Sequence, residues 1–570
     1  MIALVLAVAA SAALGRAPAV SGPVPEQFRV WGERAKADPY LIDAVPGMKG
    51  AVPRLSTREG RRGLAVFKAP PFAAVSGREV ASLTARCDLL RVADCPGQYG
   101  PLSFLVFSSR PTTLSLDVSV LQGPGGAVIP AECLDVRVVR YVKVSGDKGD
   151  EVIPLLVEKR DKVRVSANAF CRFWVTYAIP PDVKAGIYRG KVGVISAGRE
   201  SAAIPVELEV YPFALPETAM DFYVYTESSD DHAVFARELA DQRLHGMNAG
   251  LVHPPVTREG DLKRDEMAGA LDTFAAAGMS RKRAFIPLWN RITAEWLNEP
   301  DKSIRMWGPW FRYYPFSEKL DRRYVETVKF IRDESGRRGI QAVLEVSDEA
   351  GSHPWTIPAT KHYLELLKRE VPDVARELTV GGGWAGNEDE NAHWKGLLDI
   401  WSTNRWLADK LERVRKEEPG AVIEVYNMAG AGSRPGGVTA PRNFYGFFAW
   451  KAGVGGVAQW VYHHSSTPEH NYVWPAEGGG TVPTLRWEAV REGTKDRAYI
   501  EALEQRLKGR TGPVAEAGRA LLAEISSNVE LAHEDYDAIS GGRIHSPSPE
   551  TIDEWRRRIA AAVVALEAGR

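Results

Sequence analysis

After residue 60 the chain alternates apolar and polar residues over short segments. Residues 114–120 (Leu-Ser-Leu-Asp-Val-Ser-Val) show the period of two that is typical of a strand with one buried face, and Gly123 to Gly126 then supply a turn. Further strands are expected at 136–144, 173–178, 191–194 and 203–210. Short strands separated by Gly, Pro and Asp predict a β-sandwich domain over residues 61–217.

From residue 218 to residue 508, strand-like runs alternate with helix-like patterns. The apolar runs predict eight strands, at 222–226, 249–253, 284–288, 341–347, 377–381, 398–401, 422–426 and 456–462. Amphipathic stretches fill the gaps and predict helices, among them 233–244, 323–338, 404–416 and a closing helix at 486–507. Eight strands with helices between them favour a central (β/α)8 barrel, the TIM-barrel fold.

The C-terminal residues 509–570 have a different pattern. Two amphipathic stretches, at 514–531 and 549–567, predict helices, and Ser546-Pro-Ser-Pro-Glu550 is a suitable start for the second. The predicted fold class is therefore multidomain and combines β with α/β structure. It consists of an N-terminal β-sandwich, a central (β/α)8 barrel and a C-terminal helical appendage.

The N-terminal residues form two segments of different composition. Residues 1–15 are apolar and contain Ala10-Ser11-Ala12, which predicts a cleaved signal peptide and export to the periplasm or the extracellular space. The segment lacks basic residues at its start, so a trimmed or misassigned start is the alternative. Residues 16–60 show no clear periodicity and are expected to be a leader with one short helix near 25–36.

Composition and charge narrow the classes of function. A chain of 570 residues is long enough for about three domains. Its net charge of −1 gives no reason to expect a nucleic-acid or anionic-membrane partner. No segment after residue 15 is long and apolar enough for stable membrane insertion. The cysteines permit a Cys87–Cys95 bridge in an oxidising compartment, or unpaired buried thiols, with Cys133 and Cys171 further along.

The familiar cofactor and metal motifs are missing from the sequence. It contains no phosphate-cradling Gly-Lys-Ser/Thr loop, no His-Glu-x-x-His and no Gly-x-Ser-x-Gly. His463, His464 and His470 are candidate metal ligands, but no carboxylate stands at ligand spacing from them. We therefore expect no metal and no cofactor.

The strongest candidate for chemistry is the adjacent pair Asp348 and Glu349. The pair follows residues 340–346, an aliphatic run interrupted only by Gln341 and Glu345, which predicts a buried parallel strand. Acidic residues at the carboxyl end of a barrel strand are typical of catalytic groups. The alternative is that Asp348 caps the next segment while Glu349 is solvated.

Aromatic and polar side chains end most of the other predicted strands. Flat apolar faces beside Asn and Tyr hydrogen-bonding groups are typical of a sugar subsite, although any one of these residues alone is more often packing. The predicted substrate-binding residues are Tyr225, Trp289, Asn290, Trp384, Tyr426, Asn427, Trp460 and Tyr462. Glu227, His253, Trp401 and Asn404 follow the same strands.

Adjacent carboxylates suit one kind of glycoside cleavage better than the others. Most glycosidases place two carboxyl groups on either side of the scissile bond, but neighbouring residues of a strand point to opposite faces. The pair fits a reaction in which the 2-acetamido oxygen of the sugar attacks the anomeric carbon. Asp348 would then orient the amide, and Glu349 would protonate the leaving oxygen, helped by the pKa rise that a close second carboxylate causes.

Several stretches resemble glycoside hydrolase family 123, the β-N-acetylgalactosaminidase family. The similarity includes residues 173–190, residues 206–212, the Asp348-Glu349 pair and residues 483–493 with Asp496 and Tyr499. It implies that Asp348 is the amide stabiliser and Glu349 the general acid/base. Relatives often have Pro directly after the pair, whereas this chain has Ala350, a difference that bears on sugar specificity more than on the reaction class.

The sequence therefore predicts a retaining exo-glycosidase that acts on β-linked 2-acetamido sugars, with N-acetylgalactosamine favoured and a glycan or glycoconjugate as the partner. One alternative is a glycosidase of another linkage, in which Glu349 works with a distant carboxylate such as Glu227. The other is a non-catalytic glycan-binding protein with the same fold. The oligomeric state is left open by the sequence.

Overall fold

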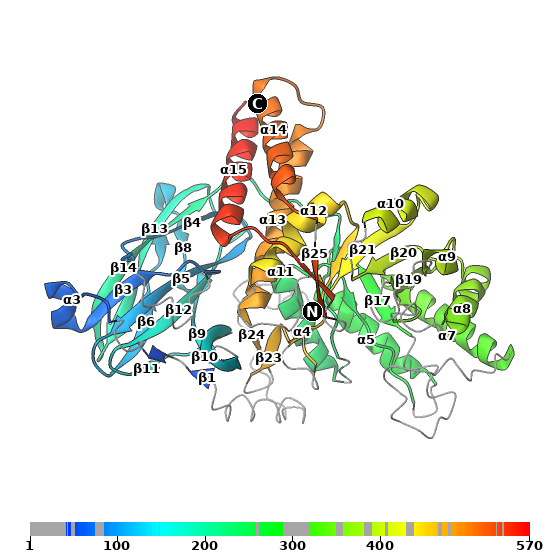
Figure 1. Ribbon diagram of the computed structural model, residues 1–570, viewed down its shortest axis with the longest axis horizontal. Helices are drawn as coiled ribbons and strands as arrows, with labels where there is room; N and C mark the ends of the chain where they lie inside the picture. Colours follow the sequence, from blue (N-terminus) through cyan, green and yellow to red (C-terminus); the bar gives the residue numbers. More distant parts are fainter. Residues whose placement is uncertain are drawn as a thin grey trace.

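The computed structural model describes most of the chain. The described residues are 41–42, 44–46, 52–73, 85–146, 149–227, 229, 231–257, 261–288, 318–348, 357–380, 390–404, 408–428, 438–464, 470–476, 480–531, 533–537 and 541–569. The predicted signal peptide (1–15) and the predicted helix near 25–36 lie outside these ranges. Figure 1 shows a β-rich domain on one side, a barrel on the other, and long C-terminal helices between and above them.

The N-terminal domain is the predicted β-sandwich. One sheet contains β1 (Leu41–Ile42), β2 (Val45–Pro46), β3 (Leu64–Lys68), β5 (Tyr99–Ser108), β9 (Leu134–Gly146), β10 (Gly149–Glu158) and β12 (Ala169–Ala178). The other contains β4 (Leu90–Asp94), β6 (Thr112–Val118), β7 (Leu121–Gln122), β8 (Val128–Ile129), β11 (Val163–Val165), β13 (Gly186–Ser196) and β14 (Arg199–Val210). Their inner faces share one apolar core, in which Phe104 and Phe173 of the first sheet meet Leu114 and Val206 of the second.

Part of the predicted leader belongs to this sandwich. The two short strands β1 and β2 pair with β9 and β12, and the capped helix α3 (Thr57–Arg62) directly precedes β3. The prediction that residues 16–60 only lead into the domain was therefore wrong for these strands. Two-residue strands have no readable period, which explains why the pattern did not reveal them.

The central domain is the predicted eight-stranded parallel barrel. Its strands are β15 (Asp221–Phe222), β16 (Gly250–Leu251), β17 (Arg283–Pro287), β18 (Gln341–Glu345), β19 (Ala375–Val380), β20 (Ile400–Thr403), β21 (Val422–Tyr426) and β22 (Gly456–Ala458). All eight predicted strands are confirmed, and each pairs in parallel with the next from β16 to β22, with β15 beside β22. The gap between β15 and β16 is bridged, because the Ala249 amide donates to the Phe222 carbonyl at 3.2 Å.

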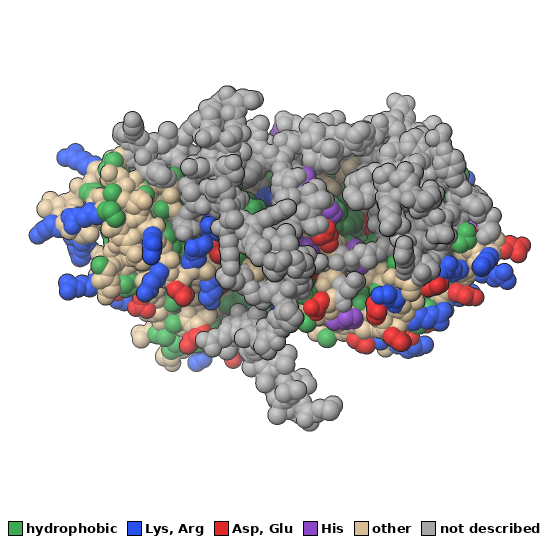
Figure 2. Space-filling model, turned by 90° about the horizontal axis from the view of Figure 1, so that it is seen from below, with side chains coloured by type: hydrophobic (Ala, Val, Ile, Leu, Met, Phe, Trp, Pro, Cys, Tyr) green, Lys and Arg blue, Asp and Glu red, His purple; other side chains and the backbone are tan. Residues whose placement is uncertain are grey.

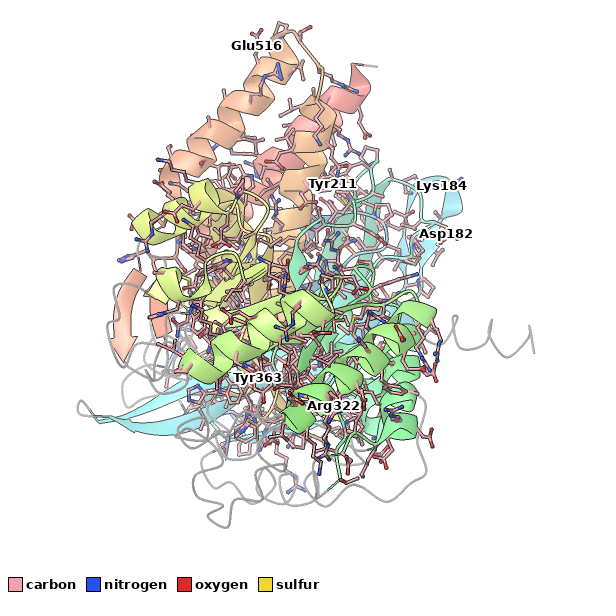
Figure 3. The ribbon with its side chains drawn as sticks, turned by 90° about the vertical axis from the view of Figure 1, so that its right-hand side faces the viewer. Asp182, Lys184, Tyr211, Arg322, Tyr363 and Glu516 are labelled. Atoms are coloured by element: carbon pink, nitrogen blue, oxygen red, sulfur yellow. The ribbon has the colours of Figure 1, made fainter. Side chains whose placement is uncertain are left out.

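Helices cover the outside of the barrel. They are α4 (His232–Leu244), α5 (Arg264–Ala277), α7 (Glu318–Arg337), α8 (Ile357–Glu370), α9 (Glu390–Trp394), α10 (Ala408–Glu417), α11 (Thr439–Asn443), the π-helical turn η8 (Phe444–Phe448) and α12 (Ala449–Ala452). Figure 3 shows α7, which carries Arg322, beside α8, which carries Tyr363, on the outer face. The Tyr324 and Tyr363 rings meet there with centroids 4.5 Å apart.

The described residues of the C-terminal part form three long helices and one hairpin. Helix α13 (Leu485–Leu507) runs between sandwich and barrel, and α14 (Pro513–Asn528) and α15 (Pro549–Ala568) pack on it around Leu503, Ile525 and Ile559. The hairpin of β25 (His533–Asp537) and β26 (Gly541–Ile544) was not predicted. The C-terminal appendage is therefore helical with an added hairpin.

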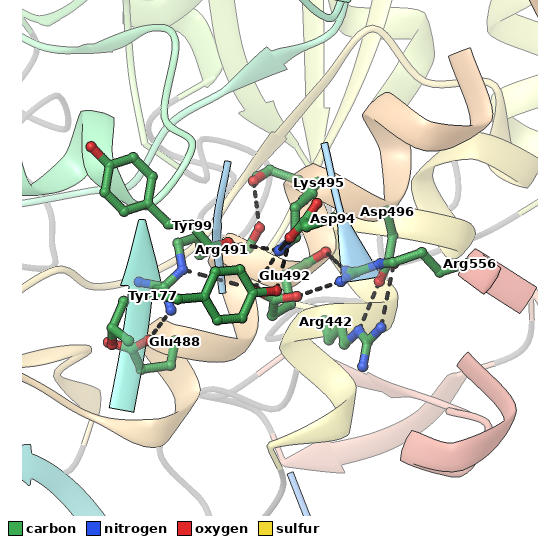
Figure 4. Close-up of polar contacts among 12 residues, drawn as sticks. Asp94, Tyr99, Tyr177, Arg442, Glu488, Arg491, Glu492, Lys495, Asp496 and Arg556 are labelled. Atoms are coloured by element: carbon green, nitrogen blue, oxygen red, sulfur yellow. Dashed lines mark hydrogen bonds and ion pairs between the residues drawn. The ribbon is translucent and has the colours of Figure 1, made fainter. Parts of the chain in front are cut away.

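A buried polar network ties the sandwich to α13. Asp94, at the end of β4, accepts hydrogen bonds from Lys495 Nζ at 2.6 Å, from the Tyr177 hydroxyl at 3.0 Å and from the Tyr499 hydroxyl at 2.9 Å (Figure 4). Lys495 and Asp94 are almost completely buried, so the pair is protected from screening by solvent. Lys495 and Tyr499 of α13 thus join this helix to the sandwich.

The same network extends to α11 and α15. Arg442 pairs with Asp496 at 2.8 Å, and Arg556 reaches both Asp496 and Glu492 at 2.5 Å. Burial would raise the pKa of Glu492, but Lys495 and the nearby arginines hold it well below the usual value. Every charge in this set has an opposite neighbour, which is the condition for burying it.

The structure bears on two expectations, the pairing of the cysteines and the lack of a membrane-spanning segment. All four cysteines are buried free thiols, and Cys95 Sγ lies 3.4 Å from the Tyr499 hydroxyl, so the alternative of unpaired thiols holds for Cys87 and Cys95. Within the described ranges, no helix combines the length and apolar character that a bilayer crossing requires.

Candidate active site at the barrel mouth

Asp348 lies at the carboxyl end of the fourth barrel strand. It follows β18 by three residues, is partly exposed, and its Oδ1 accepts a hydrogen bond from the Thr379 hydroxyl at 2.9 Å. Thr379 is buried on the neighbouring strand β19. The Asp348 carboxylate is therefore held between the fourth and fifth strands, at the face where barrel enzymes carry their catalytic groups.

Two tyrosines that follow β15 lie in the barrel interior, and the second of them is close to Asp348. The Tyr223 ring stacks on Phe285 with centroids 3.9 Å apart, and Tyr225 contacts the rings of Tyr223 and Tyr426 at centroid distances of 5.8 and 6.2 Å. Among the described residues, the buried Tyr225 hydroxyl has no hydrogen-bond partner. The structure thus brings Tyr225, Tyr426 and Asp348 together in one region of the barrel.

Electrostatics keep Tyr225 protonated. Burial, followed by the nearby Glu345, Glu377 and Asp348, raises the pKa of Tyr225 well above its usual value. A phenol in this state remains a hydrogen-bond donor throughout the neutral pH range. Its hydroxyl is therefore a neutral donor inside the barrel.

Three buried glutamates form the floor beneath this region, and the sequence reasoning missed them as a group. They are Glu345 on β18, Glu377 on β19 and Glu424 on β21. The Tyr223 hydroxyl lies 3.3 Å from Glu377 Oε1 and 3.0 Å from Glu424 Oε2. Burial raises the pKa of Glu377 well above its usual value, with Glu345 and Glu424 adding to the rise, and burial together with Asp221 raises that of Glu424 to about 8.

The protonation of this floor follows from its crowding. Carboxylates packed this closely cannot all ionise, so the cluster retains protons at neutral pH. A partly neutral floor limits the negative charge beneath Asp348. The sequence carried a signal for Glu345 and Glu424, because each interrupts a mainly apolar strand, whereas Glu377 stands beside Arg376.

Asn427 and Trp460 belong to the same rim. Asn427 Oδ1 accepts from the Trp460 amide at 2.5 Å and from Gln459 Nε2 at 3.1 Å, so it joins the ends of the seventh and eighth strands. The Trp460 ring is partly exposed and lies against His464, with centroids 4.9 Å apart. Asn427 thus positions Trp460 at the rim.

Tyr462 has a different placement from the one expected. Its side chain is completely buried, its hydroxyl donates to Asp241 Oδ2 of α4 at 2.8 Å, and its ring contacts Trp487 of α13. Tyr462 therefore packs against α4 and α13. The prediction that its side chain contacts the substrate was wrong. Trp401 is likewise buried in the barrel's apolar core.

A carboxylate and two histidines complete the rim above the first strand. Glu227 lies 4.0 Å from His463 Nδ1 and 3.6 Å from His464 Nε2, and His463 Nε2 lies 2.7 Å from Glu238 Oε1. His253 contacts the Thr226 carbonyl at 2.8 Å. Figure 2 shows histidine and acidic side chains gathered near the middle of one face. In the described part of the chain, no group of three or more side chains is suited to hold a metal ion.

Four of the predicted site residues lie outside the described residues. They are Glu349, Trp289, Asn290 and Trp384. Their roles therefore stay predictions from the sequence.

Comparison with known proteins shows a likeness of fold. No family model and no curated protein matches the chain. A family 123 glycoside hydrolase from Clostridium perfringens, described in a study of glycolipid glycan hydrolysis, superposes with a TM-score of 0.62 at 12% identity, over 89% of this chain and 98% of that one. The shared fold therefore extends over both domains.

Two further solved structures are less similar. A family 39 glycoside hydrolase from Bacteroides cellulosilyticus has a TM-score of 0.37 at 12% identity, over 72% of this chain and 82% of its own. A family 2 member from the same organism has a TM-score of 0.29 at 10% identity, over 72% and 48%. Neither likeness is strong enough to contribute to the assignment of function.

Proposed function

We propose that this protein is a retaining exo-glycosidase of the family 123 type, which removes β-linked 2-acetamido sugars, with N-acetylgalactosamine favoured. The observation that carries the proposal is the Asp348-Glu349 pair after the fourth strand of a sandwich-and-barrel fold. The fold likeness to the Clostridium perfringens enzyme supports it. Export directed by residues 1–15 remains part of the proposal.

The proposed reaction uses the substrate's own amide as the nucleophile. The 2-acetamido oxygen attacks the anomeric carbon while the bond from that carbon to the leaving oxygen breaks, and Glu349 supplies the proton to the leaving group. A cyclic oxazolinium forms. Water, deprotonated by Glu349, then attacks the same carbon, opens the ring and restores the β configuration.

Asp348 has the role of orienting and stabilising the amide. It accepts a hydrogen bond from the amide N–H and balances the positive charge of the oxazolinium, an electrostatic contribution that is large in a partly buried site. Thr379 fixes the carboxylate through its 2.9 Å hydrogen bond. The Tyr225 hydroxyl is assigned to the substrate as a neutral donor, and Tyr426 and Trp460 offer aromatic faces to the sugar.

The test uses aryl β-glycosides of N-acetylgalactosamine, N-acetylglucosamine and galactose. We expect wild-type turnover of the 2-acetamido substrates and losses of about 100-fold or more in kcat for Asp348→Asn and Glu349→Gln. Asp333→Asn changes an exposed carboxylate on α7 and is the matched control, expected to keep full activity. Wild-type rates from both site variants would refute the assigned roles.

Two alternatives give different results in the same experiment. A glycosidase that uses Glu227 as nucleophile or base would hydrolyse the 2-hydroxy substrate, which the proposed mechanism leaves inert. A non-catalytic glycan-binding protein would bind sugars without turnover, and Asp348→Asn would then change affinity alone.

A further inference from the structure

Trp460 lies where the first and eighth barrel strands meet at the mouth. The Tyr225 amide donates to the Gln459 carbonyl at 3.0 Å, and the Tyr225 carbonyl accepts from the Tyr462 amide at 2.7 Å. The two contacts bracket Trp460, so its backbone stands beside Tyr225. Tyr225 in turn lies close enough to Asp348 for that carboxylate to raise its pKa. Trp460 therefore belongs to the part of the mouth that holds Asp348, and its ring is partly exposed there.

The seventh strand fixes the Trp460 amide through a side chain. Asn427 directly follows β21, and its Oδ1 accepts from the Trp460 amide at 2.5 Å and from Gln459 Nε2 at 3.1 Å. In a regular parallel ladder the acceptor would be a backbone carbonyl. Asn427 has a φ of +53°, in the left-handed region, although its own amide still donates to the Ala458 carbonyl at 3.3 Å. The side-chain oxygen thus extends the contact between the two strands by one hydrogen bond.

The backbone conformation and the hydrogen bond together restrict which residue suits position 427. Asn is one of the few residues with a side chain that adopt the left-handed region at low cost. Gly adopts it as readily but has no side chain to hold the amide. Asp combines the same conformation with an acceptor oxygen at the same reach. Position 427 therefore uses both properties of asparagine, which points to a role for the side chain beyond ending the strand.

Neighbouring contacts hold this arrangement from two sides. The residue that follows the asparagine, Met428, is buried, and its carbonyl accepts from the Ile544 amide at 3.1 Å. On the other side the Trp460 ring packs against His464, with centroids 4.9 Å apart. The His464 amide is fixed by the buried Asn471, whose Oδ1 accepts from it at 2.8 Å. The Trp460 ring is therefore held by its neighbour as well as through its own amide.

We propose that Asn427 is a positioning residue, which sets the place of the Trp460 ring and thereby the affinity for the sugar without touching the sugar. The inference rests on the proposed function, in which Trp460 offers an aromatic face to the sugar. The Asn427 Oδ1 atom is engaged by two protein donors, so the side chain acts through Trp460. Its effect should appear in KM, because a displaced ring weakens the binding of substrate and transition state alike.

The test determines kcat and KM separately on the aryl 2-acetamido β-galactoside. Asn427→Gly keeps the left-handed backbone and removes the acceptor, so KM should rise by roughly tenfold while kcat stays within about twofold of wild type. Asn427→Asp keeps an oxygen at the same reach and should return KM to within about threefold of wild type. The matched control is Asn168→Gly, at an exposed asparagine of the sandwich with a φ of +55°, which should keep the wild-type KM.

A double-variant cycle shows whether Asn427 acts through Trp460. Adding Asn427→Gly to Trp460→Ala should change KM little, because no ring is left to displace. The inference is overturned by a wild-type KM in Asn427→Gly, by a loss confined to kcat, or by an aspartate variant no better than the glycine variant. A full additional rise of KM in the Trp460→Ala background also overturns it. If Asn427→Gly does not fold, Asn427→Ser, whose oxygen stands one bond nearer the backbone, decides the result by the same criteria.

Failure of the proposed function gives a different result. A wild-type protein that hydrolyses none of the aryl glycosides overturns the proposed function, and the inference is then decided by calorimetric titration with N-acetylgalactosamine. Weaker binding to Asn427→Gly than to wild type and Asn168→Gly supports the inference. Equal binding to all three proteins, or no binding, overturns it.

Discussion

The hydrogen bond between Thr379 and Asp348 gives a sharp prediction for Thr379→Val. Valine has nearly the same shape and suits a strand, so the change keeps the size of the side chain and removes the hydroxyl that donates to Asp348 Oδ1. A hydrogen bond to a charged group contributes about 1.5–3 kcal/mol, and a difference of about 1.4 kcal/mol is a factor of ten. We therefore expect kcat/KM to fall by about 10- to 150-fold.

The assay compares wild type, Thr379→Val and Thr379→Ser on the aryl 2-acetamido β-galactoside. Thr379→Ser keeps the hydroxyl and should recover most of the activity. The loss should appear mainly in kcat, because Asp348 is proposed to act most strongly on the charged transition state. In the Asp348→Asn background the valine change should add little, since residues that act together are not additive.

Three results would refute the reasoning on Thr379. The first is wild-type kcat/KM from the valine variant, and the second is an equal loss from the serine variant. The third is a full additional loss in the Asp348→Asn background. Melting temperatures of all variants show whether a loss of activity reflects unfolding.

Two further predictions concern stability. Lys495→Met leaves the buried Asp94 without its closest positive charge, so the free energy of unfolding in urea should fall by about 3–5 kcal/mol. The control Lys191→Met, at an exposed pair, should leave the urea midpoint unchanged. Equal midpoints for the two variants would contradict this. His245 is buried between Asp241 and Glu488, which raise its pKa from 6.5 to about 9 against the effect of burial. The protonated His245 therefore stabilises the fold by about 3 kcal/mol, fully below pH 6.5 and no longer once the pH has risen through about 9. The melting temperature should fall over this pH range more in wild type than in His245→Gln. Parallel plots of melting temperature against pH would refute this.

The barrel was predictable because its signal is repeated and local. Most of the eight strands lie in compact, mainly apolar runs, and the interval between runs suits a helix. The position of Asp348 at the end of β18 followed directly from that count. The contact between Asp348 and Thr379 did not, because it depends on the register between β18 and β19.

Other features had no local signal. Tyr462 follows β22 by four residues, and whether its ring faces the mouth or the helices depends on how the chain leaves a three-residue strand. The pair Asp94 and Lys495 is separated by 401 positions, so no pattern in the sequence links the two residues. The hairpin β25–β26 is rich in charge and glycine, which gives no period to read.

The central claim is that the sugar's amide supplies the nucleophile, and one rate ratio tests it most directly. Aryl β-glycosides of N-acetylgalactosamine and of galactose share the leaving group and differ only at C2. The ratio of their kcat/KM values therefore measures the contribution of the 2-acetamido group. The account predicts measurable turnover of the acetamido substrate and no detectable hydrolysis of the 2-hydroxy one. Comparable rates for the two would contradict it.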